Sequence, residues 1–222
     1  MASVSDRIAA NLQVIHSRMA AACRRAGRNP GAVTLVAVTK GQTTEEARAL
    51  YALGVRDFGE NRVADAEPKI AALPGDIRWH MIGSVQRRKA PEIVRLFQRV
   101  DSVDRLELAE ALNKRGEEYG APVHVLVEVN VSGEETKHGV EPAALGSFLK
   151  ATSALKFLQL EGLMTMAPLV DDPECVRPVF QRLRELARVH ALPAVSMGMS
   201  GDFEVAIEEG ATEIRVGTAL FQ

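Results

Sequence analysis

The sequence has few cysteines and no excess of either charge. Two cysteines, Cys23 and Cys175, occur in the 222 residues, far apart and without a CxxC pair. Two distant cysteines exclude a cysteine metal cluster and are typical of a reducing compartment, so we expect both to be small buried residues of a cytoplasmic protein. A net charge of -2 offers no basic surface for nucleic acid or anionic lipid.

Long apolar runs and targeting signals are also lacking. A membrane-spanning helix needs about 20 consecutive apolar residues, and no uncharged run in the sequence approaches that length. Charged residues occupy the N-terminal stretch where a signal peptide would have its apolar core. Asp6 likewise argues against an organelle transit peptide. We therefore expect a protein that binds neither membrane nor nucleic acid.

What the sequence does contain is a regular alternation of strand and helix patterns. Ile8, Leu12, Ile15 and Met19 predict an N-terminal amphipathic helix, with Ser5 as its cap. Strands are expected within residues 33–40, 54–59, 77–83, 100–103, 123–130, 160–164, 194–197 and 213–216, and helical patterns separate them.

Eight strand-helix units predict an α/β protein with a closed barrel of parallel strands. No linker or change of composition divides residues 1–222. We therefore predict a single-domain (β/α)8 TIM barrel with one extra N-terminal helix. The alternative is an open doubly wound sheet, but the segment Thr39-Lys-Gly-Gln42 lacks the GxGxxG loop expected after its first strand.

Lys40 ends the first expected strand, Val33-Thr-Leu-Val-Ala-Val-Thr-Lys40. Ligands and catalytic groups collect at the carboxyl ends of barrel strands. Apolar walls there would partly desolvate the amine, lower its pKa and leave it able to attack a carbonyl. The alternative is a lysine that simply reaches water.

A phosphate site is predicted at the ends of the last two strands. Ser200 and Gly201 follow the seventh strand, and Gly217 and Thr218 follow the eighth, which is where such barrels often bind phosphate. Ordinary capping and turn formation are the alternatives. A phosphorylated aldehyde held by phosphate at one end and by a lysine at the other is pyridoxal 5'-phosphate (PLP), and Arg215 would face its ring nitrogen. A salt bridge with Glu213 or Glu60 is the other interpretation of Arg215.

Six ordered motifs resemble those of the PLP homeostasis protein family, known as YggS or PROSC proteins. They are Val36-Ala-Val-Thr-Lys40, Phe58-Gly-Glu-Asn-Arg62, Trp79-His-Met-Ile-Gly83, Gly162-Leu-Met-Thr165, Met197-Gly-Met-Ser200 and Arg215-Val-Gly-Thr-Ala-Leu-Phe221. The family has single-domain barrels similar to the N-terminal domain of alanine racemase, PLP fold type III. The resemblance extends from about residue 5 to 222.

The resemblance implies a role for each motif residue. Lys40 would carry PLP as a Schiff base, and the phosphate would contact the residues named above as its site. Asn61 and Met164 match positions near the cofactor, although Asn61 could instead cap a helix. Arg88 stands where the family usually has asparagine, so no role of that asparagine transfers to this chain.

Composition and motifs favour a binding protein over an enzyme. Racemisation on PLP needs an acid or base on each face of the ring, and Lys40 could serve one face. The two tyrosines of the chain, Tyr51 and Tyr119, lie in expected helices away from the strand ends, so neither would serve the other face. Arg215 disfavours protonation of the ring nitrogen and makes the cofactor a weak electron sink. We predict a monomeric protein of PLP and amino-acid homeostasis without strong catalysis, with PLP-dependent apo-enzymes as candidate recipients.

Two alternatives remain open. A weak amino-acid racemase would take its second group from His80, Lys137 or His138, although His80 is expected inside the barrel and the other two could form a solvated turn. A lysine aldolase would need an acid or base near Lys40, for which Glu128 is the candidate.

Overall fold

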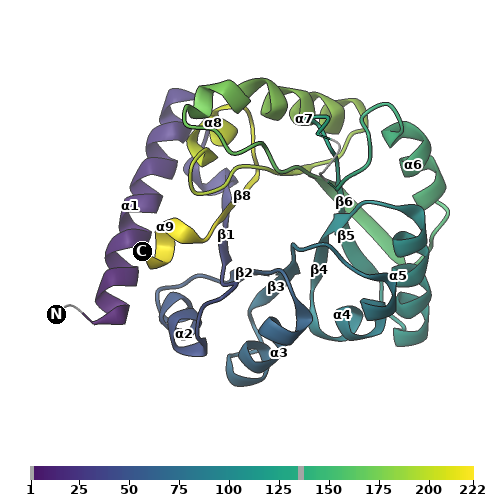
Figure 1. The fold of residues 1–222 in the computed structure, drawn as a ribbon, viewed down its shortest axis with the longest axis horizontal. Helices are drawn as coiled ribbons and strands as arrows, with labels where there is room; N and C mark the ends of the chain where they lie inside the picture. The colour runs from purple at the N-terminus through teal and green to yellow at the C-terminus, as the bar shows by residue number, and fades with distance from the viewer. Residues whose placement is uncertain (1–2, 135–137) are drawn as a thin grey trace.

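Eight parallel strands pair in chain order and close between β8 and β1 in the computed structural model, which describes residues 3–134 and 138–222 (Figure 1). The strands are β1 (Thr34–Val38), β2 (Asp57–Glu60), β3 (Arg78–Met81), β4 (Arg99–Val103), β5 (Val123–Glu128), β6 (Leu158–Met164), β7 (Ala194–Ser196) and β8 (Glu213–Val216). The predicted TIM barrel is confirmed.

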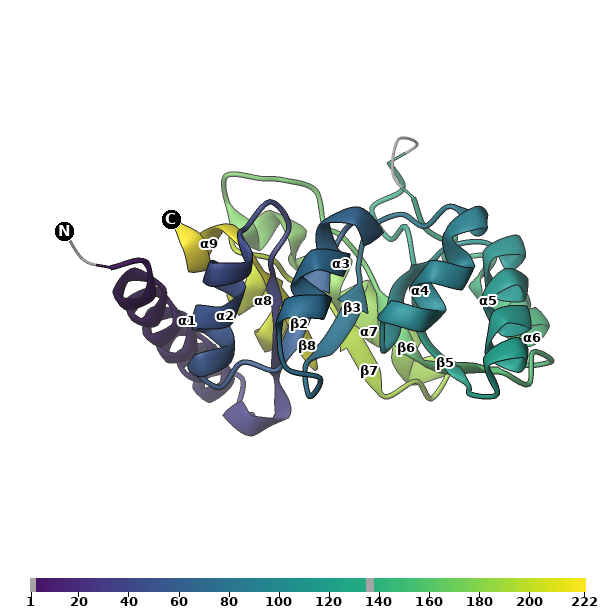
Figure 2. The same cartoon turned by 90° about the horizontal axis from the view of Figure 1, so that it is seen from below.

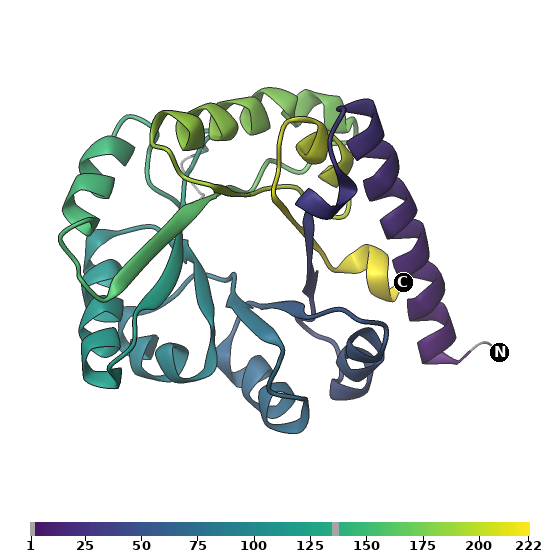
Figure 3. The same ribbon diagram turned by 180° about the vertical axis from the view of Figure 1, so that it is seen from behind.

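Helices surround this barrel on the outside (Figures 1 and 3). They are α1 (Val4–Arg25), α2 (Thr44–Ala52), α3 (Val63–Ala72), α4 (Ala90–Leu96), α5 (Leu106–Tyr119), α6 (Leu145–Thr152), α7 (Arg177–Val189), α8 (Phe203–Glu208) and α9 (Thr218–Phe221). Short 3-10 helices are η1 (Pro30–Ala32), η2 (Arg87–Lys89) and η3 (Pro173–Val176).

Strand register brings the chemically interesting segments to one edge. Val36 of β1 pairs with Arg215 of β8, and Ala37 pairs with Val216. Because parallel strands end together, the segment after β1 and the segment after β8 meet at the carboxyl edge of the barrel. In Figure 2 this edge faces upward, with α9 lying along it.

Alternation along the strands separates an outer apolar core from the barrel interior. Trp79 and Met81 of β3 belong to the core under the helices, and the Trp79 ring lies 5.3 Å from the Phe58 ring. His80 points the other way, toward the interior, as the sequence predicts. The main core is therefore the layer between strands and helices.

Capping fixes where two helices begin. Ser3, not Ser5, caps α1, because its hydroxyl accepts from the backbone N–H of Asp6 and the Asp6 carboxylate accepts from the Ser3 N–H, each at 3.1 Å. The expected cap at Ser5 is wrong, since Ser5 lies inside the first turn. Thr43 and Glu46 form the same reciprocal pair at α2.

The extra helix α1 completes the outer wall. Its predicted apolar stripe is buried, and it packs against α2, α8 and α9. The side-chain amide of Asn11 also donates to the carbonyl oxygens of Leu220 and Gln222, at 3.1 and 2.8 Å. The first and last elements of the fold are thus in direct contact (Figure 3).

The two cysteines differ in exposure. Cys23 is buried in α1, as expected, but Cys175 is exposed in η3, so the expectation of burial is wrong for that residue. Both are free thiols. Among the described residues, no helix is both long enough and apolar enough to span a membrane.

Candidate functional site

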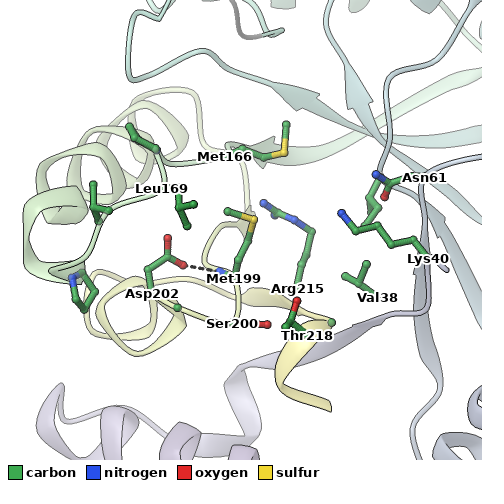
Figure 4. A pocket seen from close by; sticks show the side chains of 16 residues that line it. Val38, Lys40, Asn61, Met166, Leu169, Met199, Ser200, Asp202, Arg215 and Thr218 are labelled. Carbon is green, nitrogen blue, oxygen red and sulfur yellow. Dashed lines mark hydrogen bonds between the residues drawn. The ribbon is translucent and has the colours of Figure 1, made fainter. Parts of the chain in front are cut away.

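A cavity of about 280 Å³ opens at the carboxyl edge of the barrel (Figure 4). Seven of the eight residues predicted to bind the cofactor line it, namely Lys40, Asn61, Ser200, Gly201, Arg215, Gly217 and Thr218. Met164, the eighth, is buried at the end of β6 and is not part of the lining. The segments after β1, β2, β7 and β8 therefore converge on one space.

Lys40 stands above the rim of the barrel. Strand β1 ends at Val38, and Gly41 turns the chain with a φ of +73°. The side chain is exposed and reaches over the cavity beside Asn61 (Figure 4), so the expected desolvation by apolar walls is not observed. Lys40 lies two residues beyond the end of β1 at Val38, which explains why its side chain is exposed rather than enclosed by apolar walls.

The residue before Lys40 is firmly anchored. The Thr39 hydroxyl donates to a carboxylate oxygen of Glu60 at 2.6 Å, and the Lys69 ammonium donates to the Thr39 carbonyl at 2.6 Å. Lys69 also pairs with Glu60 at 2.6 Å, and all three residues are buried. Lys40 is therefore an exposed amine that directly follows an anchored residue.

Arg215 forms the deep end of the cavity. Its guanidinium donates to the Ser196 hydroxyl at 2.6 Å and to the Thr165 carbonyl at 2.8 Å, and the residue is 4% exposed. The alternative salt bridge with Glu213 or Glu60 is not formed among these contacts. Two neutral acceptors thus hold a buried cation in a fixed orientation.

Two buried carboxyl groups accompany Arg215. Asp202 lines the cavity and accepts from the Met199 backbone N–H at 2.6 Å, and burial raises its pKa. Burial also raises the pKa of Glu128, at the end of β5, to about 7; the Asp104 carboxylate adds to this rise and Arg215 opposes it. Glu128 does not line the cavity, so the candidate acid or base of the aldolase alternative is not in place.

The two predicted phosphate loops are joined to each other. The Ser200 hydroxyl accepts from the Ala219 backbone N–H at 3.4 Å. A Cβ added to Gly217 would lie 3.1 Å from the Val38 carbonyl oxygen, so a larger residue would push the loop away from β1. Gly201 faces open space, and the Thr218 hydroxyl has no hydrogen-bond partner among the described residues. These free polar groups fit an anion such as phosphate.

A charged network fills the barrel interior. His80 forms hydrogen bonds through both ring nitrogens, from Nε2 to Asp57 at 3.0 Å and from Nδ1 to Asp101 at 3.3 Å. Burial alone would lower the pKa of His80, but the charge of Asp101 and the two hydrogen bonds outweigh it and raise the pKa to about 9. Both ring nitrogens are occupied, which confirms the interpretation of His80 as an interior residue and removes it as a proton-transfer group.

The same network offers a geometry of the metal-ligand type. His80, Asp101 and Glu213 place one ligand atom each within 4.8 Å of one another. Arg99 occupies the space by pairing with Asp101 at 2.7 Å and with Glu213. A protonated imidazole cannot ligate a metal, so this cluster is satisfied by Arg99.

Sequence reasoning missed the apolar wall of the cavity. Met166, Pro168, Leu169 and Val170, in the segment after β6, line one side, and Leu169 is 98% exposed. The sequence feature that could have identified these residues is a short apolar run immediately after the sixth strand. Asn61 is not a helix cap, because Arg62 holds that position in α3.

Of the predicted loop residues Lys137 and His138, the structure describes His138, and it lies outside the cavity. Lys137 lies outside the described residues. His138 is exposed, and its Nδ1 lies 3.8 Å from an Asp104 carboxylate oxygen. Neither His138 nor Arg88 lines the cavity.

Comparison with known proteins identifies the family. Residues 5–222 match the model of the alanine racemase N-terminal domain. The chain is 43% identical over 217 residues, 95% of both chains, to the pyridoxal phosphate homeostasis protein of Aquifex aeolicus. It is 41% identical to the protein of the same name from Pseudomonas aeruginosa. The 219 matched residues cover 96% of this chain and 94% of the relative.

A solved structure agrees with this similarity. The structure of PipY of Synechococcus elongatus PCC7942 with PLP bound superposes on this chain with a TM-score of 0.81. The two sequences are 34% identical, and the match covers 99% of this chain and 100% of PipY. These matches extend over nearly the entire barrel. The chain therefore belongs to the pyridoxal phosphate homeostasis proteins, a family with the alanine racemase N-terminal domain fold.

Proposed function

We propose that this protein binds PLP in the cavity beside Lys40 and acts in the intracellular homeostasis of PLP and amino acids. The observation that carries the proposal is the meeting, in one cavity, of an amine, a buried guanidinium and two loops with free polar groups. These are the three contacts that a phosphorylated pyridine aldehyde needs. The PLP-bound structure of PipY supports the same assignment.

Each residue would act on a different part of the ligand. The Lys40 amine would condense with the aldehyde, forming a carbon-nitrogen double bond and releasing water. Ser200, Gly201, Gly217 and Thr218 would bind the phosphate. Arg215 would face the ring nitrogen and oppose its protonation. When bound, PLP supplies an electrophilic carbon that amines can attack.

Asn61 and Met164 would contribute differently. The amide of Asn61 lies beside Lys40 and has no hydrogen-bond partner among the described residues, so it is free to bind the ligand near its aldehyde. Met164 does not line the cavity, and we assign it no direct contact with PLP.

Strong catalysis is not part of the proposal. Among the described residues that line the cavity, the titratable side chains are Lys40, Asp202 and Arg215. Arg215 is held by two acceptors, and Asp202 directly follows the predicted phosphate loop at Ser200 and Gly201, on the side of the cavity away from Lys40 (Figure 4). Tyr51 donates to Asp76 at 2.8 Å and does not line the cavity. The racemase alternative gains no group from the cavity.

The cellular part of the proposal follows from exposure. Lys40 and the cavity mouth are open, so PLP-dependent apo-enzymes could receive the cofactor directly. The free thiols of Cys23 and Cys175 favour a cytoplasmic location.

The proposal is tested by the visible spectrum of the purified protein after PLP addition. Wild type should develop a yellow band that borohydride removes, and peptide mapping should then find the label on Lys40. Lys40→Ala should abolish the band, whereas Lys114→Ala, which changes an exposed lysine on α5, should not. A label mainly on Lys137, or a band that survives in Lys40→Ala, would overturn the assignment.

A further inference from the structure

A buried ion pair lies directly behind the amine of the proposed PLP site. The Lys69 ammonium, on α3, pairs at 2.6 Å with Glu60 at the end of β2, and both residues are buried. The Thr39 hydroxyl binds the same carboxylate. Thr39 immediately precedes Lys40, and Glu60 immediately precedes Asn61. Three buried residues in mutual contact therefore stand behind two residues that line the PLP cavity.

Lys40 occupies one corner of a β-turn. The Gln42 backbone N–H donates to the Thr39 carbonyl at 3.0 Å, which closes a turn with Lys40 and Gly41 at its centre. The φ of +73° at Gly41 is the value that the third residue of a type II turn requires. The Lys69 ammonium donates to the same Thr39 carbonyl at 2.6 Å. A side chain of α3 thus holds the acceptor that closes the turn carrying Lys40.

The ion pair is poorly built for stability alone. The Thr39 hydroxyl and the Lys69 ammonium both bind Oε1 of Glu60, each at 2.6 Å. The other carboxylate oxygen, Oε2, is buried and has no hydrogen-bond partner among the described residues. Apolar residues of similar volume often replace a buried ion pair with no loss of stability. A buried carboxylate with an unused oxygen therefore calls for a reason other than packing, and the turn at Lys40 supplies one.

We propose that Lys69 and Glu60 are positioning residues for the PLP site, which hold the turn so that the Lys40 amine lies over the cavity before the ligand arrives. The inference rests on the proposed function, since that proposal makes Lys40 the amine that condenses with the aldehyde. The condensation forms a carbon-nitrogen double bond and releases one water. A turn that is already ordered loses less conformational entropy in this step, which favours the bond.

The two halves of the PLP site should respond differently to loss of the pair. The phosphate loops after β7 and β8 and the guanidinium of Arg215 make no contact with Lys69 or Glu60 among the printed hydrogen bonds of the described chain. Their hold on phosphate and ring should persist when the pair is removed. The bond to Lys40 alone should weaken.

The first experiment compares PLP with pyridoxine 5'-phosphate, which has an alcohol in place of the aldehyde and cannot bond to an amine. Glu60→Gln/Lys69→Met removes both charges together and keeps an acceptor for the Thr39 hydroxyl. In this variant PLP should bind at least about tenfold more weakly, because misplacing a reacting group is costly. Pyridoxine 5'-phosphate should bind as it does to wild type. The matched control is Lys114→Met/Glu117→Gln, two exposed residues of α5, which should change neither affinity.

A second pair of variants guards against failure of the double variant to fold. Thr39→Val removes the hydroxyl contact with Glu60 and should weaken PLP in the same direction. Thr39→Ser keeps the hydroxyl and should bind PLP as wild type does. Urea unfolding of each PLP-free protein shows which variants remain folded.

The Gln42 amide reports on the turn when no PLP is present. Its N–H closes the turn, so its hydrogen exchange, measured by NMR on the PLP-free protein, should be at least about tenfold faster in Glu60→Gln/Lys69→Met. The exchange rate in the α5 control should match wild type.

Three results would overturn the inference: an unchanged PLP affinity in the folded variants, an equal loss of affinity for PLP and pyridoxine 5'-phosphate, or unchanged exchange at Gln42. An equal loss would mean that the pair supports the entire cavity rather than the turn. If wild type forms no bond between PLP and Lys40, the proposed function fails, whereas exchange at Gln42 still decides whether the pair holds the turn.

Discussion

At the scale of the residue, the site depends on a few positions with unusual freedom. Gly41 turns the chain at a φ of +73° directly after Lys40, and Gly217 lets the last loop approach β1. The sequence identified both glycines and the side chains that they position. It did not predict the exposure of Lys40, because the strand was expected to extend two residues further than its end at Val38.

The phosphate loops give a prediction at this scale. Pyridoxal, which lacks the phosphate, should bind much more weakly than PLP. Ser200→Ala should weaken PLP binding by about 1 kcal/mol, the typical contribution of one hydrogen bond, or somewhat more for a charged acceptor. Fluorescence or absorbance titrations measure both effects.

The control for this prediction is Ser17→Ala, an exposed serine of α1 whose hydroxyl donates to the Gln13 carbonyl. It should leave PLP affinity unchanged. Equal affinity for pyridoxal and PLP would show that the two loops do not bind phosphate.

At the scale of the element, the strands carry two patterns, an apolar one that predicts where strands lie and a charged one. The apolar run of β1 and the alternation in β3 predicted strand positions well. The charged alternation in Arg99-Val-Asp101 and Glu213-Ile-Arg215 was visible too, but a barrel interior held together by ion pairs was not expected. Pairing between strands distant in sequence decides which charges meet, and no local pattern contains that information.

The interior network makes stability depend on pH. The folded-state pKa of His80, about 9, exceeds its unfolded value of 6.5, so the folded chain holds this proton more tightly. The resulting stabilisation is complete below about pH 6.5 and is lost as the pH rises through about 9, with a total of about 3 kcal/mol. Urea unfolding of the PLP-free protein at several pH values measures it.

His80→Gln should lower the free energy of unfolding at pH 6.5 and flatten its decline between pH 6.5 and 9.5. His16→Gln, which changes an exposed histidine of α1, is the matched control and should behave as wild type. Identical pH profiles for wild type and His80→Gln would contradict the role assigned to the imidazolium.

At the scale of the whole molecule, closure of the barrel has a consequence for assembly. A closed sheet has no free edge that could pair with a second chain. Large exposed apolar residues of the described chain are scattered over several elements, such as Val14 on α1, Tyr119 on α5 and Val189 on α7. Met166, Leu169 and Val170 are exposed together beside the cavity. The monomer expected from the sequence stays a prediction.

Light scattering at micromolar concentration should therefore give a mass near 24.1 kDa, with or without PLP. The reason is that the closed sheet leaves no edge strand with which a second chain could pair. A stable dimer would contradict this prediction and would allow a partner chain to contribute a group to the PLP cavity.

The contact between α1 and the last helices also affects the order in which the protein can fold. The apolar stripe of α1 is completed by α8 and α9, and Asn11 binds the carbonyls of Leu220 and Gln222. A growing chain on the ribosome makes α1 before these partners. The wall around β1 therefore cannot close until α8 and α9 have been made, and until then α2 is the one of these three helices that can cover part of the apolar face of α1.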